Sequence, residues 1–398
     1  MTSARTAAIA LAATLAIQIY TAFAAAAAAV LAPEIALAFD VEARWIGAFI
    51  GLVYAGGMIA SLASGGFIER LGSIRVSQAC VVLCALGVAG IAFAPAHAIA
   101  LVAAFGIVIG LGYGPITPAS SQLLQRTAPP ARMALTFSIK QTGVPAGAAL
   151  AGALLPALAL ATGWRGAFAI AALAGLAIVA VAQPIRAGLD ADRNPKGRVS
   201  VAGVFAPLRL LRHSRALRDL AFVAFAYSAT QVCLTSFLVV YLTETLGYSL
   251  VAAGLALTIA TIGGVAGRVA WGYVADRWLA PRRVLATIGF CAGACGVLMA
   301  SATTAWSPLA IGVLAALFGA TAIGWNGVQL SEVARLAPPG SAGKVTGATG
   351  FVTFAGVVVG PPSFALLSSA TGSYRIGFAA FAAASVCAAV ALLARRIQ

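Results

Sequence analysis

The sequence predicts an all-α polytopic membrane protein in which twelve transmembrane helices form two similar six-helix bundles. Of the 398 residues, 62% are hydrophobic and only 9% are charged, and the mean hydropathy is +1.00. Soluble domains carry about 25% charged residues. Apolar runs long enough to cross a bilayer follow one another along the chain, and motifs of the first half recur in the second.

Twelve apolar runs between polar breaks are the expected spans. Six lie at 7–32, 46–68, 76–95, 98–122, 133–158 and 165–183, and six at 220–242, 250–275, 284–302, 309–331, 345–368 and 376–394. The first run resembles a secretory signal peptide, but it is longer than the apolar region of such a peptide. It is also needed as a partner in the repeat, so we interpret it as a span.

The basic residues predict the orientation, because cytoplasmic loops of membrane proteins are rich in Lys and Arg. With cytoplasmic termini, only Arg44, Arg165 and Arg375 lie outside, Lys140 and Arg268 lie within spans, and the remaining 20 of 25 basic residues are cytoplasmic. The opposite orientation would reverse this distribution. We therefore predict a multi-pass protein of the cytoplasmic (inner) membrane. The net charge of +15 then faces anionic lipid and not nucleic acid.

We expect a monomer with neither cofactor nor metal. The six cysteines lie in apolar runs and form no ligand-like cluster with His97 and His213. Buried packing is the usual role of such cysteines.

Four pairs of motifs indicate that the second half copies the first. The matches are "ERLGSIR" at 69–75 with "DRWLAPRR" at 276–283, Cys80 and Cys84 with Cys291 and Cys295, "QRTAPPA" at 125–131 with "ARLAPPG" at 334–340, and "ATGWRGAF" at 161–168 with "ATGSYRIGF" at 370–378. A duplicated six-span unit is typical of transporters, which bind substrate near mid-bilayer between the repeats.

The repeat predicts a first bundle at 1–183, a cytoplasmic linker at 184–219 and a second bundle at 220–398. Within the linker, every third residue from 209 to 218 is arginine: Arg209, Arg212, Arg215 and Arg218. This spacing favours an amphipathic helix on the anionic cytoplasmic leaflet. A solvated charged linker is the alternative.

The loop after the second span resembles the signature G-x-L-a-D-R-x-G-R-R of the major facilitator superfamily. It reads "GGFIERLGSI", with Gly65, Glu69, Arg70 and Gly72 at key positions, and the second copy supplies Gly272, Asp276 and Arg277, followed by Arg282 and Arg283. The chain departs from the signature at Glu69, where Asp is usual, and at Leu279, where the second Gly is expected.

The resemblance implies twelve spans and a cytoplasmic gate made by these two loops. A carboxylate at one helix end can pair with basic residues or with the positive N-terminus of a neighbouring helix. Such contacts close one face of a transporter and break when the halves move. The alternative is a basic loop that only sets the topology.

Two positive charges are expected deep in the membrane. Lys140 lies eight residues past Arg132, and Arg268 lies eight residues before Asp276, so each is about 12 Å from its helix end. All ten acids fall at span ends or in loops. A charge at the bilayer centre costs about 2.5–3.5 kcal/mol, so two cations at this depth suggest a water-filled cavity for an anion.

The spacing Arg-x-x-x-Gly-x-x-x-Asp in "GRVAWGYVADR" is similar to that of the monocarboxylate transporters and the oxalate–formate exchanger, in which this arginine binds a carboxylate. The stretch "SIKQTGVPAG" resembles cyanate-type permeases. In the resembled fold, spans 5 and 8 meet across the central cavity. The alternative for each cation is a structural role: hydrogen bonding of Lys140 to backbone carbonyls near Pro145, and stabilisation of the gate by Arg268.

Eight further polar residues at comparable depth are candidate substrate ligands or helix-packing groups. They are Gln18, Tyr20, Tyr113, Gln141, Tyr227, Gln231, Asn326 and Thr353.

These features predict a secondary transporter of a small organic anion, such as a carboxylate or dicarboxylate, that works by alternating access. Coupling by anion exchange and coupling by proton symport both remain open, with the proton on the substrate or on Lys140. A proton-driven exporter of drugs or metabolites is the alternative, although it predicts a deep acid. A ligand sensor is not excluded. An enzyme is least expected, since the chain has no Gly-x-Ser-x-Gly motif, metal cluster or phosphate loop.

Overall fold

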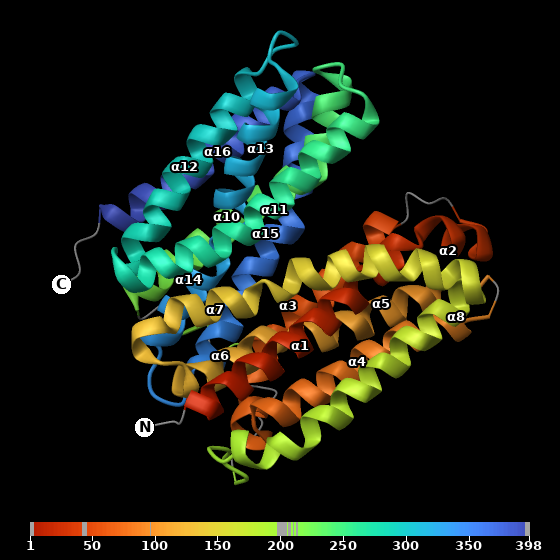
Figure 1. Ribbon diagram of the computed structural model, residues 1–398, viewed down its shortest axis with the longest axis vertical. Helices are drawn as coiled ribbons and strands as arrows, with labels where there is room; N and C mark the ends of the chain where they lie inside the picture. Colours follow the sequence, from red (N-terminus) through yellow and green to blue (C-terminus); the bar gives the residue numbers. More distant parts are fainter. Residues whose placement is uncertain are drawn as a thin grey trace. The chain divides into compact units, whose positions relative to one another are not determined.

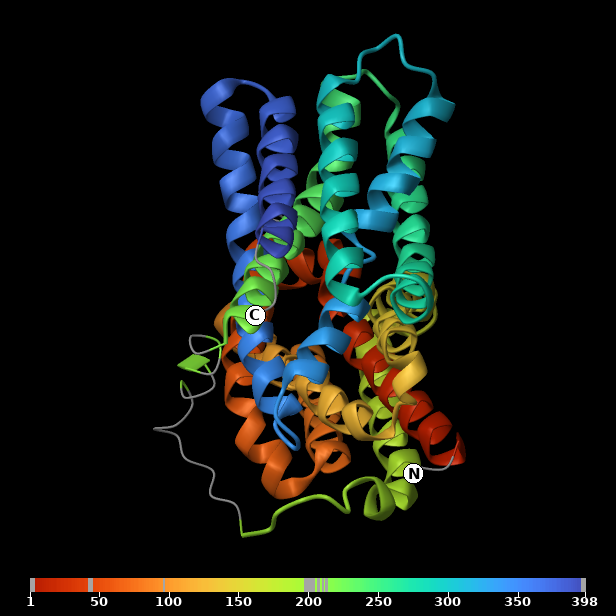
Figure 2. The same ribbon diagram turned by 90° about the vertical axis from the view of Figure 1, so that its left-hand side faces the viewer.

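The computed structural model describes residues 4–41, 46–95, 97–196, 205, 208–209, 211 and 214–394. Within these ranges the regular structure is entirely helical (Figures 1 and 2). Eleven helical segments are long and apolar enough to cross a membrane. One of them, residues 130–189, contains two of the expected spans, which meet at Gly163 with φ 74° and ψ 160°. The predicted all-α, twelve-span fold is confirmed.

The helices of the first half lie close to the predicted spans. They are α1 (Ala4–Val30), a short α2 (Ala32–Phe39), α3 (Ile46–Leu71), α4 (Ser73–Phe93), α5 (Ile99–Tyr113), α6 (Ile116–Thr127), the 3₁₀ turn η2 (Pro130–Arg132), α7 (Met133–Gln141) and α8 (Gly143–Leu189). The second half contains α10 (Arg215–Glu244), α11 (Leu250–Arg277), α12 (Pro281–Ser301), α13 (Pro308–Ala322), α14 (Asn326–Leu336), α15 (Ala342–Thr371) and α16 (Tyr374–Leu393).

Three spans that we expected as single helices each contain a break of one to three residues, which we call an interruption. The backbone at Gly114, Pro115, Thr142 and Ile323 stays in the right-handed helical region. Span 4 is α5 and α6, joined at Gly114-Pro115; span 5 is α7 and α8, joined at Thr142; and span 10 is α13 and α14, joined at residues 323–325. Proline lacks the N–H that continues a helix, and glycine weakens it.

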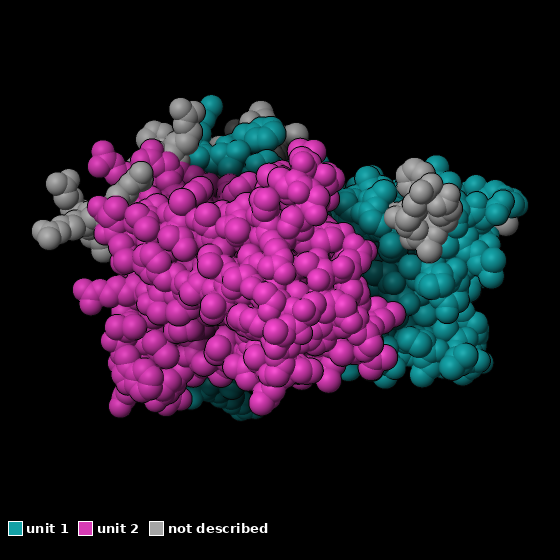
Figure 3. Space-filling model, turned by 90° about the horizontal axis from the view of Figure 1, so that it is seen from above, with its two compact units in different colours: residues 1–128, 140–210, 337–351 teal, residues 129–139, 211–336, 352–398 magenta. Residues whose placement is uncertain are grey.

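The chain forms two compact units, which Figure 3 distinguishes by colour. The first unit contains residues 1–128, 140–210 and 337–351, and the second contains residues 129–139, 211–336 and 352–398. The beginning of α7, from the first half of the sequence, therefore belongs to the second unit. The beginning of α15, from the second half, belongs to the first unit. The boundary at 184–219 stays a prediction. In the structure α8 continues to Leu189 and α10 begins at Arg215.

The proposed basic helix of the linker is covered only in part. Arg212 lies outside the described residues, and Arg215 and Arg218 belong to the first turn of α10. A surface helix carrying all four arginines therefore remains a prediction.

Glycines bring pairs of helices into close contact at equivalent places in the two halves. A Cβ on Gly110 of α5 would overlap the carbonyl of Val53 on α3, and a Cβ on Gly319 of α13 would overlap the carbonyl of Ala260 on α11. In lipid, where apolar side chains gain little by leaving their surroundings, such small-residue contacts are a main source of helix association. The paired spans 2 and 4, and 8 and 10, are therefore held at a spacing that glycine sets.

Candidate functional site

Lys140 forms a buried polar cluster within the first unit. Its side chain is 1% exposed at the end of α7. Its Nζ donates to Oε1 of Gln18 at 2.6 Å, to Oε1 of Gln141 at 2.9 Å and to Oγ1 of Thr117 at 3.5 Å. We call these four residues the lysine cluster. It joins α1 to the interruptions of spans 4 and 5, since Thr117 follows one interruption and Gln141 precedes the other.

A pocket of about 230 Å³ lies in the same unit as the lysine cluster. We call it the tyrosine pocket, because Tyr54 and Tyr113 form part of its wall with ring centroids 6.4 Å apart and planes at 73°. Its lining is Ala22, Ala25, Ala26, Ala29, Ile50, Val53, Tyr54, Tyr113, Val144 and Ala148. Three of these residues lie one helical turn from the cluster, since Ala22 follows Gln18, Val144 follows Lys140, and Tyr113 precedes Thr117. The pocket therefore begins about one helical turn from the cluster, whose four residues are not part of its lining.

Arg268 and Gln231 contact the interruption of span 10 within the second unit. Arg268 is 2% exposed, and its Nε donates to the carbonyl of Ile323 at 3.1 Å. Oε1 of Gln231 accepts hydrogen bonds from Trp325 Nε1 and Asn326 Nδ2, both at 3.2 Å. Both side chains thus hold the segment where α13 gives way to α14, and this contact favours a supporting role for at least the Nε of Arg268.

The other three predicted ligands are Tyr20, Tyr227 and Thr353. Of these, Tyr227 packs its ring edge-to-face against Trp325, which bonds Gln231, with ring centroids 5.8 Å apart. Tyr20 packs in the apolar core of the first unit, and its hydroxyl has no hydrogen-bond partner in the part of the chain that the structure describes. The Tyr227 hydroxyl donates to the carbonyl of Leu285 at 2.8 Å. The carbonyl of Thr353 accepts a hydrogen bond from Ser228 at 2.9 Å. Tyr20 points away because it lies two residues, about 200° of helical turn, from Gln18.

The first signature loop meets the beginning of α15. Glu69 forms an ion pair with Lys344, and a Cβ on Gly65 would come within 2.9 Å of the Lys344 Cα. All three residues belong to the first unit. Sequence reasoning missed Lys344, although the repeat offset of 209 makes it the counterpart of Leu135 at the start of α7.

The same loop is also held by Asp190, at the end of α8. Its carboxylate accepts hydrogen bonds from the backbone N–H groups of Ile74 and Arg75 at 2.8 and 3.0 Å. Burial raises the pKa of this carboxyl group, while the two backbone hydrogen bonds act in the opposite direction. Gly72 has φ 95°, and a Cβ there would collide with Asp190. Glycine is therefore required at position 72 for two reasons: the positive φ angle, and the lack of space for a Cβ beside the Asp190 carboxylate.

The second signature loop meets the beginning of α7 within the second unit. The carboxylate of Asp276 accepts hydrogen bonds from the backbone N–H groups of Ala134 at 2.9 Å and Leu135 at 2.7 Å. A Cβ on Gly272 would lie 2.5 Å from Oγ of Ser138. Asp276 therefore caps α7 with negative charge at the positive helix end. Glu69 and Asp276 act on helix starts that are equivalent in the repeat.

The basic members of the signature contribute less to these contacts. Arg70 and Arg283 are exposed, and Arg277 lies beside Asp276 on a pocket of about 520 Å³. Arg282, the neighbour of Arg283, instead forms an ion pair with Asp219 at 2.7 Å and donates to the carbonyl of Leu392. In the described residues, the two acids and the glycines, and not these arginines, make the loop-to-helix contacts.

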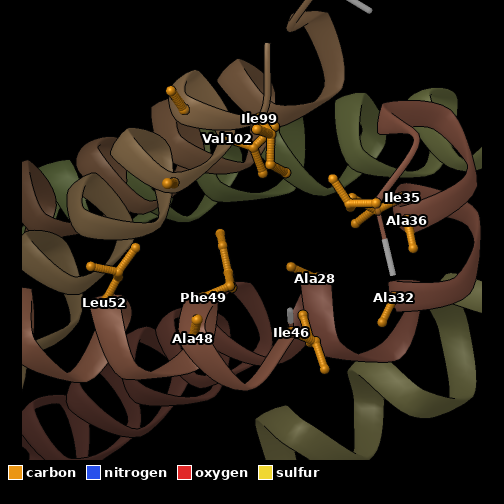
Figure 4. A pocket seen from close by; sticks show the side chains of 13 residues that line it. Ala28, Ala32, Ile35, Ala36, Ile46, Ala48, Phe49, Leu52, Ile99 and Val102 are labelled. Carbon is orange, nitrogen blue, oxygen red and sulfur yellow. The ribbon is translucent and has the colours of Figure 1, made fainter. Parts of the chain in front are cut away.

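A second pocket of about 390 Å³ lies between α1–α2 and the beginnings of α3 and α5 (Figure 4). Every side chain that lines it is apolar, with Ile35, Phe49 and Val102 among the largest. It offers no side-chain donor or charge for an anion, so the lysine cluster and the tyrosine pocket remain the candidate site.

The chain contains two six-span repeats, polar clusters at the breaks of spans 4, 5 and 10, and carboxylates at repeat-equivalent helix ends. A duplicated six-span unit is an architecture typical of membrane transporters. The family comparison agrees, since residues 13–361 match the model of the Major Facilitator Superfamily. The chain belongs to this superfamily, as the signature loops predicted, and its members are transporters and not enzymes.

Among curated relatives, two uncharacterised MFS-type transporters of Mycobacterium tuberculosis, from strains CDC 1551 and H37Rv, are each 26% identical over 291 residues. The matched region covers 73% of this chain and 64% of each relative, slightly under two thirds of their length.

Solved structures of low sequence identity share the fold. The human organic anion transporter MFSD10 aligns with a TM-score of 0.77 and 18% identity, covering 98% of this chain and 100% of that one. The Escherichia coli fucose:proton symporter FucP aligns at 0.75 and 19%, covering 99% and 100%. A bacterial homologue of the iron transporter ferroportin, in an outward-facing state, aligns at 0.76 and 17%, covering 97% and 98%.

Replacing Asp276 by alanine is expected to loosen the start of α7. The variant loses two charge-assisted hydrogen bonds, each worth about 1.5–3 kcal/mol. We expect the amide hydrogens of Ala134 and Leu135 to exchange at least about tenfold faster, as measured by hydrogen-exchange mass spectrometry. Asp276→Asn keeps one acceptor and should fall between the two, while Arg283→Ala should match the wild type. Unchanged exchange in Asp276→Ala would show that the cap does not hold this helix.

Proposed function

We propose that the protein is a secondary transporter of a small organic anion and that Lys140 binds the anionic group. The observation that carries this proposal is the position of its ammonium group, which is buried at the breaks of spans 4 and 5, one helical turn from a pocket. The cytoplasmic location of both termini, and of the signature loops, is part of the same proposal.

The energetics favour an anion as the ligand of this lysine. A charge near the bilayer centre costs about 2.5–3.5 kcal/mol. The amide oxygens of Gln18 and Gln141 offset part of this cost as neutral dipoles. Hydrogen bonds between ammonium and carboxylate are roughly twice as strong as those between neutral groups. A carboxylate that entered the pocket would therefore gain more from Nζ than an uncharged ligand would.

Arg268 has a second role in this proposal. Its Nε donates to the carbonyl of Ile323, and the planar guanidinium group suits a carboxylate. The same side chain contacts the junction of α13 and α14. An anion bound to Arg268 would therefore alter the contacts that support span 10. We propose Arg268 as a substrate-binding residue of the second unit that also supports span 10.

Alternating access requires contacts that form in one state and break in another. We propose that the Glu69–Lys344 ion pair and the Asp276 cap on α7 are these contacts. Both are polar and lie at helix ends, where water can replace the lost hydrogen bonds at low cost. Coupling is either anion exchange or proton symport, with the proton carried by the substrate or by Lys140.

The fold by itself does not choose the substrate. It is shared with an organic anion transporter and with a fucose:proton symporter. The buried lysine, and not the likeness to either structure, therefore supports the choice of a small anion from the monocarboxylate, oxalate–formate or cyanate class.

The test is ligand-dependent thermal stability of the purified wild-type protein. Formate, acetate, oxalate, cyanate and nitrate would be compared with acetamide and glycerol as neutral ligands. An anion at 100 times its Kd should stabilise the folded state by about 2.7 kcal/mol, and the neutral ligands should leave Tm unchanged. If only bulky cationic or neutral compounds raise Tm, the anion proposal fails and a proton-driven exporter takes its place.

A further inference from the structure

We infer that the transported anion is a monocarboxylate with a short apolar tail and that the tyrosine pocket holds this tail. The inference rests on the proposed function, in which Lys140 binds the carboxylate. The inference concerns the apolar part of the substrate, which the lysine does not recognise. It predicts that monocarboxylates with an apolar tail bind more tightly than dicarboxylates and inorganic anions.

The spacing between lysine cluster and pocket suits one small molecule. Ala22 lies four residues, about 6 Å, beyond Gln18 on α1. Val144 lies four residues beyond Lys140, across the break of span 5, where Thr142 keeps helical dihedral angles. A carboxylate bonded to Nζ of Lys140 would therefore direct a chain of a few carbons toward these side chains. Both parts of the site belong to the first unit.

The pocket lining is suited to hydrocarbon. Ala22, Ala25, Ala26 and Ala29 follow the spacing i, i+3, i+4 and i+7, so one face of α1 presents only methyl groups. The facing helix α3 adds Ile50 and Val53. Burial of apolar surface against such a wall is favourable and has no directional requirement.

The same lining disfavours a second charge. None of the ten lining residues carries a charge, and the tyrosine hydroxyls of Tyr54 and Tyr113 are their only side-chain polar groups. A second carboxylate at this end would lose hydration without a cation in the wall to replace it. The structure therefore supports a dicarboxylate less than a monocarboxylate, although the charge pattern of the sequence allowed both.

The volume limits the length of the tail. At about 230 Å³, the pocket is smaller than the roughly 300–1,000 Å³ of sites for drug-sized ligands. The two tyrosine rings, in edge-to-face contact, bound it with rigid aromatic surface. We expect a tail of a few carbons, with affinity that rises along a short homologous series and then falls.

The test measures competition of unbranched monocarboxylates, from formate to octanoate, with uptake of labelled acetate into proteoliposomes. Each added CH₂ should improve affinity about fourfold until the pocket is full. Succinate and glutarate should compete no better than acetate. If affinity does not change along the series, or if dicarboxylates bind more tightly, the inference that the pocket binds an apolar tail is wrong. The proposal that Lys140 binds an anion would still stand. If no carboxylate competes, and none stabilises the protein, the proposed function itself fails.

Two matched Ala→Leu substitutions in α1 test whether the tyrosine pocket is where the tail binds. Ala26→Leu fills the tyrosine pocket and should remove the gain in affinity from each added CH₂. Ala16→Leu makes the same change at an exposed position of α1 outside the pocket and should retain the wild-type series. If Ala26→Leu does not fold, Ile50→Ala enlarges the pocket and should move the best tail length up by one or two carbons. A series that is the same in wild type, Ala26→Leu and Ile50→Ala would show that the tail binds elsewhere.

Discussion

Replacing Lys140 by methionine is expected to abolish anion transport and to leave the protein folded. Methionine has a similar length but no charge, so the anion loses its partner and Gln18 and Gln141 lose a donor. Truncating one partner of a buried charged hydrogen bond costs about 2–5 kcal/mol, a loss of about 30- to 5,000-fold in affinity. The measurement is uptake, into proteoliposomes, of the anion that most stabilises the wild type.

The stability of this variant is expected to differ little from that of the wild type, because two effects oppose each other. Removing the buried charge relieves about 2.5–3.5 kcal/mol, and leaving amide oxygens without a donor costs about 1–3 kcal/mol. Tm without ligand should therefore change by only a few degrees, while the shift caused by anions disappears.

A lysine outside the spans provides the control. Lys196 is exposed, and Lys196→Met should retain both uptake and the anion-dependent shift in Tm. Wild-type uptake by Lys140→Met would refute the assigned role of the lysine. A variant that is inactive but still stabilised by anions would indicate that Lys140 acts in the transport cycle and not in binding.

Replacing Gly319 by alanine is expected to destabilise the second unit. The new Cβ would overlap the backbone carbonyl of Ala260, so α13 and α11 must move apart. Overpacking of this kind costs about 1–3 kcal/mol, and a backbone carbonyl has no alternative rotamer that relieves it. The measurement is thermal unfolding in detergent, with a lower yield of monodisperse protein as a second readout.

Gly312, two turns earlier on α13, is the matched control. A Cβ there would meet only Cδ1 of Ile259, at 3.7 Å, an ordinary van der Waals contact. Gly312→Ala should be neutral or stabilising by up to about 1 kcal/mol, since alanine favours helix more than glycine does. Equal Tm values for the two variants would mean that the separation of α11 and α13 does not depend on Gly319.

Much of the fold could be predicted from the sequence because a bilayer imposes strong, local requirements. Each span needs about 20 apolar residues, whatever its neighbours are, so the runs that begin at Ile46 and Leu250 locate α3 and α11 without knowledge of packing. The repeat located Glu69 and Asp276 at equivalent helix ends for the same reason.

The interruptions of spans 4, 5 and 10 were less accessible to sequence reasoning. Gly114-Pro115 is a visible signal, but Thr142 and residues 323–325 are compatible with a continuous helix. Whether such a segment bends depends on partners that accept or supply its backbone hydrogen bonds, as Arg268 does for the carbonyl of Ile323.

The sequence alone determined the helical class, the number of spans, the repeat and the presence of a lysine deep in a span, because these follow from composition and spacing along one chain. Only the tertiary structure decided which side chains meet. In the structure, Lys140 donates a hydrogen bond to Gln18, and Glu69 forms an ion pair with Lys344. Tyr20 packs in the apolar core, and Tyr54 lines the pocket. A helix presents a polar residue to one direction only, and the neighbour in that direction comes from a distant part of the chain.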